Sequence, residues 1–325
     1  MKILVRLPNW LGDMIMAEGF LGQLQKAYPQ AEISVIAKKG IHDLLPYFPG
    51  IKHHFIFSKD EFKGLRGLWR FGRMIAKKEQ FDIFFSLPDS FSSALMGYAT
   101  KTKKRIGFKN ELRNVLLTNA YSKPKGLHRV EEYVHLLEQF TGQRYNNSTV
   151  SLHHKFTKQE HIVVNINSEA SSRRLTTAKA VEMINLLRKA VPHNIILIGG
   201  PKEKVFVEQV MLLLDDVAGI ESVAGKTTLT QLVQILASAQ LLLTTDSGPA
   251  HLANALGTET IVLFGAGNEN NTAPYNQDLR CIIRLGKLSC EPCMKNICVR
   301  FQTPQCLELL DSRRIVEEVQ QKLNK

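Results

Sequence analysis

Several features that would assign this chain of 325 residues to a large class of proteins are missing from its sequence. No uninterrupted apolar run approaches the roughly 18 residues that a helix needs to span a bilayer. The first residues lack the basic head, apolar core and small-residue cleavage site of a secretory signal. We therefore expect a cytoplasmic protein. Internal repeats of 20 to 50 residues and low-complexity segments are missing too.

Cysteine is scarce, with five in the chain, and four of the five lie between Cys290 and Cys306. This crowding does not resemble the disulfide framework of a secreted protein. The spacing of Cys290, Cys293, Cys298 and Cys306 is C-x2-C-x4-C-x7-C, which is compatible with a tetrahedral zinc site. Free thiols or an occasional disulfide suit the same spacing, and we favour them over a structural zinc.

Two common catalytic signatures are also missing. The histidines are scattered without ligand spacing, and no Ser-His-Asp order suggests a hydrolase. The segment from Gly225 to Thr228 resembles the end of a P-loop, but Ile220 stands where the upstream glycine is required. The sequence therefore argues against an ATPase.

What the sequence does have is an uneven distribution of charge. Residues 1–155 carry 24 Lys and Arg against 13 Asp and Glu, whereas residues 156–325 carry 18 against 17. The net charges of the two halves are therefore +11 and +1. An excess on one side indicates an anionic partner, which could be nucleic acid, a membrane surface or an acidic substrate. Composition alone does not choose among them.

The order of apolar and polar segments predicts an α/β protein with two doubly wound, Rossmann-like domains. In the first half we expect strands over residues 2–7, 33–37 and 81–87, and helices over 13–27 and from 91 onward. A polar, irregular stretch over residues 141–158 is the expected linker. The second half predicts strands over 161–167, 194–198, 241–245 and 260–264, and helices over 177–190, 229–239, 249–256 and 313–322. We expect domains over residues 1–155 and 156–325.

The most informative segment is Thr244-Thr245-Asp246-Ser247-Gly248-Pro249-Ala250-His251, which joins an apolar run to a helix-like stretch. Ser247 suits the N-cap and Pro249 the first turn, so we expect the backbone N–H groups of residues 247–250 to point outward unpaired. A helix N-terminus at the carboxyl edge of a parallel sheet contributes about half a positive charge that favours an anion. The segment predicts a nucleotide diphosphate site, although an ordinary capped helix without a ligand would have the same sequence.

Asp13 follows Gly12 at the expected junction of the first strand and the first helix. The helix N-terminus favours the ionised carboxylate, and a general base must be charged and within hydrogen-bond reach of the hydroxyl that it activates. Asp13 is therefore a candidate base. Capping of the helix accounts for an aspartate at this position equally well.

Several segments together resemble the ADP-heptose:lipopolysaccharide heptosyltransferases. The first is Pro8-Asn9-Trp10-Leu11-Gly12-Asp13-Met14, whose Trp-Leu-Gly-Asp form is similar to that of heptosyltransferase II, and another is the segment from Thr245 to His251. The others are residues 87–94 (LPDSFSSA), 105–108 (RIGF), 199–203 (GGPKE) and 263–265 (LFG). Each fragment alone is weak, but the set follows the family's order over nearly the whole chain.

The resemblance implies a GT-B fold in which two Rossmann-like domains face a central cleft. The N-terminal domain would bind a lipid acceptor and the C-terminal domain the nucleotide sugar. It implies an inverting glycosyltransferase that transfers a heptose from ADP-heptose to the inner core of lipopolysaccharide, with Asp13 as the catalytic base. The residues that match the family's diphosphate motif are Asp246, Ser247, Gly248 and His251, while Glu203 and Thr227 fall where the family contacts ribose and adenine.

The resemblance also implies catalysis without a divalent metal, so side chains and amides must neutralise the leaving group. The family places a lysine after the strand that opens the second domain, and Arg173 stands at that position here. Arginine keeps the charge and can hold a phosphate with two N–H groups, but its geometry differs from that of lysine. The segment 168–176 also lacks the family's Gly, aromatic residue and Pro. A solvated helix entrance is the alternative explanation of Arg173.

Basic residues at helical spacing in the N-terminal half predict an amphipathic helix. Lys63, Arg66, Arg70, Arg73 and Lys77 recur every three or four residues, while Leu65, Leu68, Trp69 and Ile75 are expected on another side. The helix could lie on anionic lipid head groups, although most charged helix faces are simply solvated. The residues that would extend this patch are Lys101, Lys103, Lys104, Arg105, Lys109 and Arg113. With the resemblance, this favours a cytoplasmic protein peripheral to the inner membrane.

Other functions fit part of the sequence. A related GT-B enzyme with another nucleotide sugar or another core acceptor would share these motifs. A non-catalytic relative that binds the lipopolysaccharide core would explain the altered segment 168–176. A nucleic-acid binder would explain the positive half but not the anion turn, so we expect no nucleic-acid partner.

Overall fold

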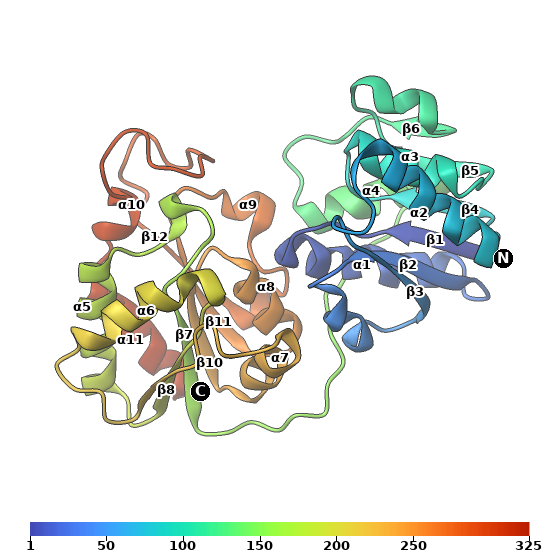
Figure 1. Cartoon of the computed structure of the whole chain (residues 1–325). Helices are drawn as coiled ribbons and strands as arrows, with labels where there is room; N and C mark the ends of the chain where they lie inside the picture. Colours follow the sequence, from blue (N-terminus) through green and yellow to red (C-terminus); the bar gives the residue numbers. More distant parts are fainter. Residues whose placement is uncertain (325) are drawn as a thin grey trace. The chain divides into compact units, whose positions relative to one another are not determined.

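The computed structural model describes residues 1–324, apart from the side chain of Glu111. The chain divides into two compact units, Met1–His153 and a second unit that begins at His154. Each unit is built on a six-stranded parallel sheet with helices beside it (Figure 1). The expected α/β class with two doubly wound, Rossmann-like halves is therefore confirmed.

The first unit has the strand order β3-β2-β1-β4-β5-β6. Its strands are β1 (Lys2–Arg6), β2 (Glu32–Lys38), β3 (Ile51–Phe57), β4 (Ile83–Ser86), β5 (Lys104–Phe108) and β6 (Asn119–Tyr121). Its helices are α1 (Leu11–Ala27), α2 (Gly64–Lys78), α3 (Phe91–Ala99) and α4 (Arg129–Thr141), with 3-10 turns over His42–Tyr47 and Glu111–Leu116. Helix α1 packs against α4, and α2 packs against α3.

Two adjacent phenylalanines of β4 show why this strand is apolar throughout its first three residues. Phe84 belongs to a buried cluster with Leu68 and Phe71 of α2. Phe85 makes an edge-to-face contact with Phe20 of α1, with ring centroids 5.2 Å apart. Because successive side chains of a strand point to opposite faces, both faces of the sheet are covered by helices.

The second unit repeats the arrangement with the strand order β12-β11-β10-β7-β8-β9. Its strands are β7 (His161–Asn165), β8 (Asn194–Leu197), β9 (Ile220–Ser222), β10 (Leu241–Thr245), β11 (Glu259–Phe264) and β12 (Arg280–Arg284). Its longer helices are α5 (Thr177–Ala190), α6 (Lys204–Leu212), α7 (Leu229–Ser238), α8 (Gly248–Ala255) and α11 (Ser312–Leu323). Shorter helical segments are Ser171–Arg173, Pro201–Glu203, α9 (Glu269–Thr272), Gln277–Leu279 and α10 (Gln305–Glu308).

Each strand order contains one point at which the winding reverses, between β1 and β4 in the first unit and between β7 and β10 in the second. Ligands of open α/β sheets bind at the carboxyl ends of the strands that flank such a point. Asp13 and Ser90 follow the two strands of the first unit, and Arg173 and Asp246 follow those of the second. The fold therefore places the candidate residues at the edges where ligands are expected.

Some local expectations differ from the structure. Helix α1 begins at Leu11, two residues before the expected start, and β7 ends at Asn165 rather than at residue 167. Part of the expected linker is attached to α1, because Gln23 Nε2 donates to Ser148 Oγ at 3.3 Å and Glu18 accepts from Ser151 N–H at 2.9 Å. Within residues 1–324, none of the helices is long and apolar enough to cross a membrane.

Candidate active site

Asp13 lies in the first turn of α1, just beyond the carboxyl end of β1. Trp10 occupies the N-cap position, and the Asp13 carboxylate instead contacts Arg129 of α4, with 3.5 Å between Asp13 Oδ1 and Arg129 Nε. Helix capping therefore does not account for Asp13. Its side chain is 28% exposed, so the carboxylate is accessible from solvent.

The surroundings of Asp13 raise its pKa. Burial is the largest influence and lifts the pKa above the usual value of 3.8, whereas the positive charge of Arg129 lowers it. Glu132 adds a further increase because a second negative charge nearby disfavours ionisation. A carboxylate whose pKa lies closer to neutral pH accepts a proton more readily, which suits a general base.

Arg129 belongs to a chain of charges that the sequence analysis did not single out. Its Nη1 lies 2.8 Å from Glu132 Oε1, and Lys123 Nζ lies 3.0 Å from the same oxygen. Lys123 also lies 3.1 Å from Asp89 Oδ2, in the loop after β4. Positive and negative groups therefore alternate from Asp13 to Asp89. The sequence signal that could have indicated this chain of charges was Lys123 shortly before α4 and Arg129 at its start.

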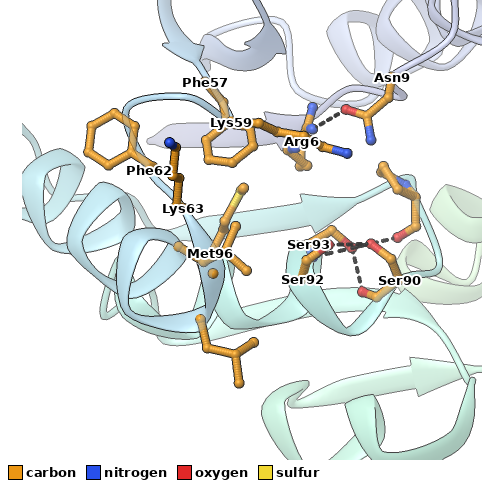
Figure 2. A pocket seen from close by; sticks show the side chains of 14 residues that line it. Arg6, Asn9, Phe57, Lys59, Phe62, Lys63, Ser90, Ser92, Ser93 and Met96 are labelled. Atoms are coloured by element: carbon orange, nitrogen blue, oxygen red, sulfur yellow. Dashed lines mark hydrogen bonds between the residues drawn. The ribbon is translucent and has the colours of Figure 1, made fainter.

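A cavity of about 610 Å³ lies at the same edge of the first sheet (Figure 2). Lys59 and Lys63 and the guanidinium of Arg6 contribute positive charge, and hydroxyl groups come from the start of α3. Figure 2 shows aromatic rings and Met96 lining another part of the cavity. The hydroxyl groups are those of Ser90, Ser92 and Ser93, and the apolar lining includes Phe57, Phe62, Leu65 and Leu68.

Arg6 is a buried cation that the sequence analysis treated only as part of a strand. It is 2% exposed, and burial lowers its pKa to about 10, so it stays charged at neutral pH. Its guanidinium donates to the carbonyls of Leu7 and Ile36. It also donates to Asn9 Oδ1, as Figure 2 shows. These bonds hold the loop between β1 and α1, and with it the start of the helix that carries Asp13.

The expected basic patch needs two corrections. Arg113 is 1% exposed and donates to Pro88 O and Ser86 Oγ, both at 2.9 Å, so it supports the loop after β4 rather than facing solvent. On α2, Leu68 and Ile75 are buried as expected, but Leu65 and Trp69 are 61% and 44% exposed. These two apolar side chains therefore share the solvent-facing side of α2 with its basic residues.

In the second unit, the structure brings Arg173 and Asp246 together. Arg173 Nη1 lies 3.1 Å from Asp246 Oδ2, and the Asp246 side chain is 5% exposed. Burial raises the pKa of Asp246, whereas Arg173 and then Arg284 lower it. Arg173 is therefore not a solvated residue at a helix entrance. An ideal Cβ on Gly267 would lie 2.0 Å from Asp246 Oδ2, so only glycine leaves room for this pair.

The start of α8 differs in part from the expected anion turn. Ser247 is the N-cap residue as expected, but its Oγ donates to Thr245 O and accepts from Asn165 Nδ2 instead of capping the helix. Pro249 has no N–H, and the N–H of Ala250 donates to Ser247 O at 3.1 Å. The prediction of four outward N–H groups is therefore wrong for residues 249 and 250. The N–H groups of Ser247 and Gly248 remain as candidates.

Asn165 and Asn167 join this edge and were missed by the sequence analysis. Asn165 Nδ2 lies within hydrogen-bond distance of Thr244 Oγ1 and Ser247 Oγ, and Thr245 Oγ1 donates to Asn167 O at 2.6 Å. Two asparagines at the end of a fully buried strand were the signal that could have indicated them. Their bonds hold the carboxyl ends of β7 and β10 together beside Arg173.

The remaining predicted residues lie around the same sheet. His251 is buried on α8. Glu203 Oε2 accepts from the N–H of Gly200 at 2.6 Å, and Gly225 N–H donates to Gly199 O at 2.8 Å. The turn after β8, which contains Glu203, therefore lies beside the turn after β9. Thr227 follows this second turn, just before α7, and is partly exposed.

The cysteine-rich segment after β12 supports the turn that carries Arg173. Ser172 Oγ donates to Lys295 O at 2.5 Å, and Ser172 N–H donates to Asn296 O at 3.2 Å. All five cysteines are free, and burial raises the pKa of Cys306 to about 11. Among the described residues, no group of three or more His, Cys, Asp and Glu side chains is arranged to hold a metal ion.

Comparison with known proteins now adds to this geometry. The model of Glycosyltransferase family 9 (heptosyltransferase) matches residues 68–302. Lipooligosaccharide heptosyltransferase 2 of Campylobacter jejuni serotype O:6 is 24% identical over 334 residues, which cover 98% of each chain. Among curated relatives, lipopolysaccharide heptosyltransferase 2 of Escherichia coli K12 is 25% identical over 320 residues and 88% of each chain.

The solved structures show the same fold. The ADP-heptose lipopolysaccharide heptosyltransferase II of E. coli matches with a TM-score of 0.84 and 24% identity, over 99% of this chain and 98% of that one. The expectation of a GT-B fold is confirmed by this likeness, and the family model covers well over half of the chain. The resemblance seen in the motifs is thereby confirmed, and the chain belongs to glycosyltransferase family 9, the heptosyltransferase family.

Proposed function

We propose that this protein is an inverting glycosyltransferase that transfers a heptose from ADP-heptose to the inner core of lipopolysaccharide. Each unit has candidate reactive groups beside the point at which the winding of its sheet reverses. The first, over about residues 1–155, has a carboxylate with a raised pKa and a cationic cavity, which suits an acceptor domain. The second, over about residues 156–325, has an arginine beside a helix N-terminus, which suits a nucleotide-sugar domain. The names of its relatives, heptosyltransferase 2, support the choice of sugar and acceptor.

In this proposal Asp13 is the catalytic base. It takes the proton of an acceptor hydroxyl while that oxygen forms a bond to the anomeric carbon of the donor. The bond from the same carbon to the diphosphate breaks, and its electron pair leaves with ADP. Because the nucleophile attacks from the side opposite the leaving group, the configuration at the anomeric carbon inverts.

Arg173 neutralises the negative charge that develops on the leaving diphosphate. Its pairing with Asp246 holds the guanidinium before substrate arrives, so little reorganisation is needed during transfer. Asp246 therefore acts by holding Arg173 rather than by touching phosphate, which its own charge would repel. The N–H groups of Ser247 and Gly248 face the diphosphate, His251 supports the turn from within α8, and Glu203 and Thr227 contact ribose and adenine. No metal cofactor takes part in this scheme.

The cavity of the first unit holds the acceptor. Lys59 and Lys63 suit the phosphates and acidic sugars of a lipopolysaccharide core, because charge-assisted contacts favour such groups. The aromatic part of the cavity suits the apolar faces of sugar rings. Asp13 is positioned by the loop that Arg6 and Asn9 of this same cavity hold.

We also propose that the protein lies on the cytoplasmic face of the inner membrane. The solvent-facing side of α2 combines Leu65 and Trp69 with Arg66 and Arg70, and the Trp69 ring contacts exposed Tyr98 at 5.9 Å between centroids. Aromatic and basic side chains on one surface favour an anionic lipid interface. Charge reversal at Arg66 and Arg70 should reduce sedimentation with anionic vesicles but not affect neutral vesicles, whereas Lys189→Glu in the second unit should change neither.

The transfer itself is tested with ADP-heptose and truncated lipopolysaccharide cores that carry zero or one heptose, with products read by mass spectrometry. Asp13→Asn should lower the rate roughly a hundredfold to ten-thousandfold while sparing ADP affinity, because only proton removal is lost. Asp43→Asn, at an exposed acid of the same unit, should leave the rate unchanged. An unchanged rate in Asp13→Asn would refute its role as base.

The same materials separate the alternatives. Calorimetric titration with ADP and UDP identifies the nucleotide, and a clear preference for UDP would remove the heptose assignment. Binding of the core without turnover on either acceptor would favour a non-catalytic relative.

A further inference from the structure

The charge chain around Asp13 uses more residues than proton transfer alone requires. Five alternating charges come from separate parts of the first unit: Asp13 in α1, Arg129 and Glu132 in α4, Lys123 after β6 and Asp89 after β4. Tyr133, buried on α4, is the further titratable group whose pKa responds to Asp13. These groups are the charged and titratable neighbours that the described structure gives to Asp13.

Arg129 uses two different nitrogen atoms for its two carboxylate partners. Nε lies 3.5 Å from Asp13 Oδ1 in an ion pair without a hydrogen bond, and Nη1 donates to Glu132 Oε1 at 2.8 Å. The guanidinium is planar and rigid, so the bond of Nη1 to Glu132 restricts where Nε can lie. Lys123, 3.0 Å from the same Glu132 oxygen, in turn holds Glu132. The contact with Arg129 occupies one side of the Asp13 carboxylate and leaves Oδ2 outside that ion pair.

The second carboxylate matters when Asp13 becomes neutral. A guanidinium does not lose its proton in proteins, so Arg129 stays positive throughout the reaction. If Asp13 were its only partner, protonation of Asp13 would leave a half-buried cation without a counter-charge, which would oppose proton transfer. Glu132 keeps Arg129 paired in both protonation states.

We propose that Arg129 is a positioning residue for the base: its ion pair with Oδ1 orients the Asp13 carboxylate, while Glu132 balances the charge of Arg129 whenever Asp13 carries a proton. This role rests on the proposed function for its catalytic meaning. The geometry of the charge chain does not depend on which sugar is transferred.

Two neutral variants should move the titration of Asp13 in opposite directions. Arg129→Gln removes a positive charge and should raise the pKa of Asp13 by about one pH unit, whereas Glu132→Gln removes a negative charge and should lower it. The pKa is measured in the free protein by following the carboxyl carbon signal that Asp13→Asn removes from the spectrum. Arg144→Gln, which breaks an exposed ion pair with Glu138 at the far end of α4, should leave it unchanged.

The pH profile of kcat/KM then tests the catalytic role, because its acid limb reports the base of the free enzyme. The limb should shift with the measured pKa in Arg129→Gln and Glu132→Gln. Arg129→Lys keeps the charge but cannot direct one nitrogen to each carboxylate, so it should leave the acid limb in place and lower kcat roughly tenfold. Circular dichroism checks that each variant is folded.

The outcomes distinguish the two hypotheses. The wild-type protein could transfer no heptose while Arg129→Gln and Glu132→Gln still change the pKa of Asp13 in opposite directions. That result would refute the proposed function but not the charge chain. Asp13 titrations that are the same in all variants would overturn the inference whatever the activity. Equal loss of kcat in Arg129→Lys and Arg144→Gln would likewise overturn it, because the effect would not depend on Asp13.

Discussion

Glu18 offers a quantitative test of how the first unit is held together. It lies on α1, is 5% exposed, and its Oε2 accepts a hydrogen bond from Ser151 N–H at 2.9 Å. Burial raises the pKa of Glu18 from its usual 4.5 to about 7, and the Ser151 N–H and Lys26 oppose the increase only in part. A buried carboxyl group that ionises near neutral pH is expected to destabilise the folded state at higher pH.

The sign follows from the proton that each state binds. Below pH 4.5 the group is protonated in both states, and above about 7 it is ionised in both. Between these values the folded state keeps the proton and the unfolded state does not, so the free energy of unfolding falls as pH rises. At about 1.4 kcal/mol per pH unit the loss amounts to about 3 kcal/mol by pH 8.

Glu18→Gln removes this loss, because glutamine has no charge to bury and its carbonyl oxygen can still accept from Ser151. We expect the free energy of unfolding of the variant to exceed that of the wild type by about 3 kcal/mol at pH 8 and by under about 1 kcal/mol at pH 5. Urea unfolding followed by tryptophan fluorescence measures this, and both tryptophans, Trp10 and Trp69, lie in the first unit. Glu61→Gln, at an exposed ion pair, is the matched control. A stability difference independent of pH would refute the reasoning.

Two glycine substitutions test close contacts in the two units. Gly267→Ala should displace Asp246 Oδ2, 2.0 Å from the new Cβ, and weaken ADP binding roughly tenfold in calorimetry, because the Arg173 pair is lost. Gly22→Ala meets nothing closer than 3.8 Å and should leave ADP binding unchanged, so equal affinities in the two variants would contradict the first expectation. Gly97→Ala would meet the Phe84 ring at 2.3 Å and should lower the free energy of unfolding by about 1 to 3 kcal/mol, whereas an unchanged urea midpoint would show that the ring moves freely.

Local patterns predicted most of the central elements. Apolar runs of three or four residues between helix-like stretches indicated β1, β4, β7, β10 and β11, because central strands of a parallel sheet are buried on both faces. Edge strands were harder to recognise. Residues 52–54 of β3 are polar and exposed, so its apolar residues do not form one continuous stretch, and β6 has only three residues.

Side-chain roles were predicted less well than elements. Asp13 and the turn from Asp246 onward were indicated by their places between a predicted strand and a predicted helix, whereas Arg173 was indicated only by the resemblance to the heptosyltransferases. The sequence predicted Arg113 to be on the surface, but the structure buries it. The charge of a residue does not reveal whether a buried carbonyl group, here that of Pro88, accepts its hydrogen bonds.

The sequence by itself therefore determined the class of fold, the alternation of its elements and the motifs that mark the family. These depend on periodicity and turn chemistry within short segments. The tertiary structure alone decided which charges meet: Arg173 with Asp246, and Arg129 with both Asp13 and Glu132. Most of these partners lie far apart in the chain, and only the packing of strands and helices around each sheet brings them within the few ångströms at which charges interact strongly.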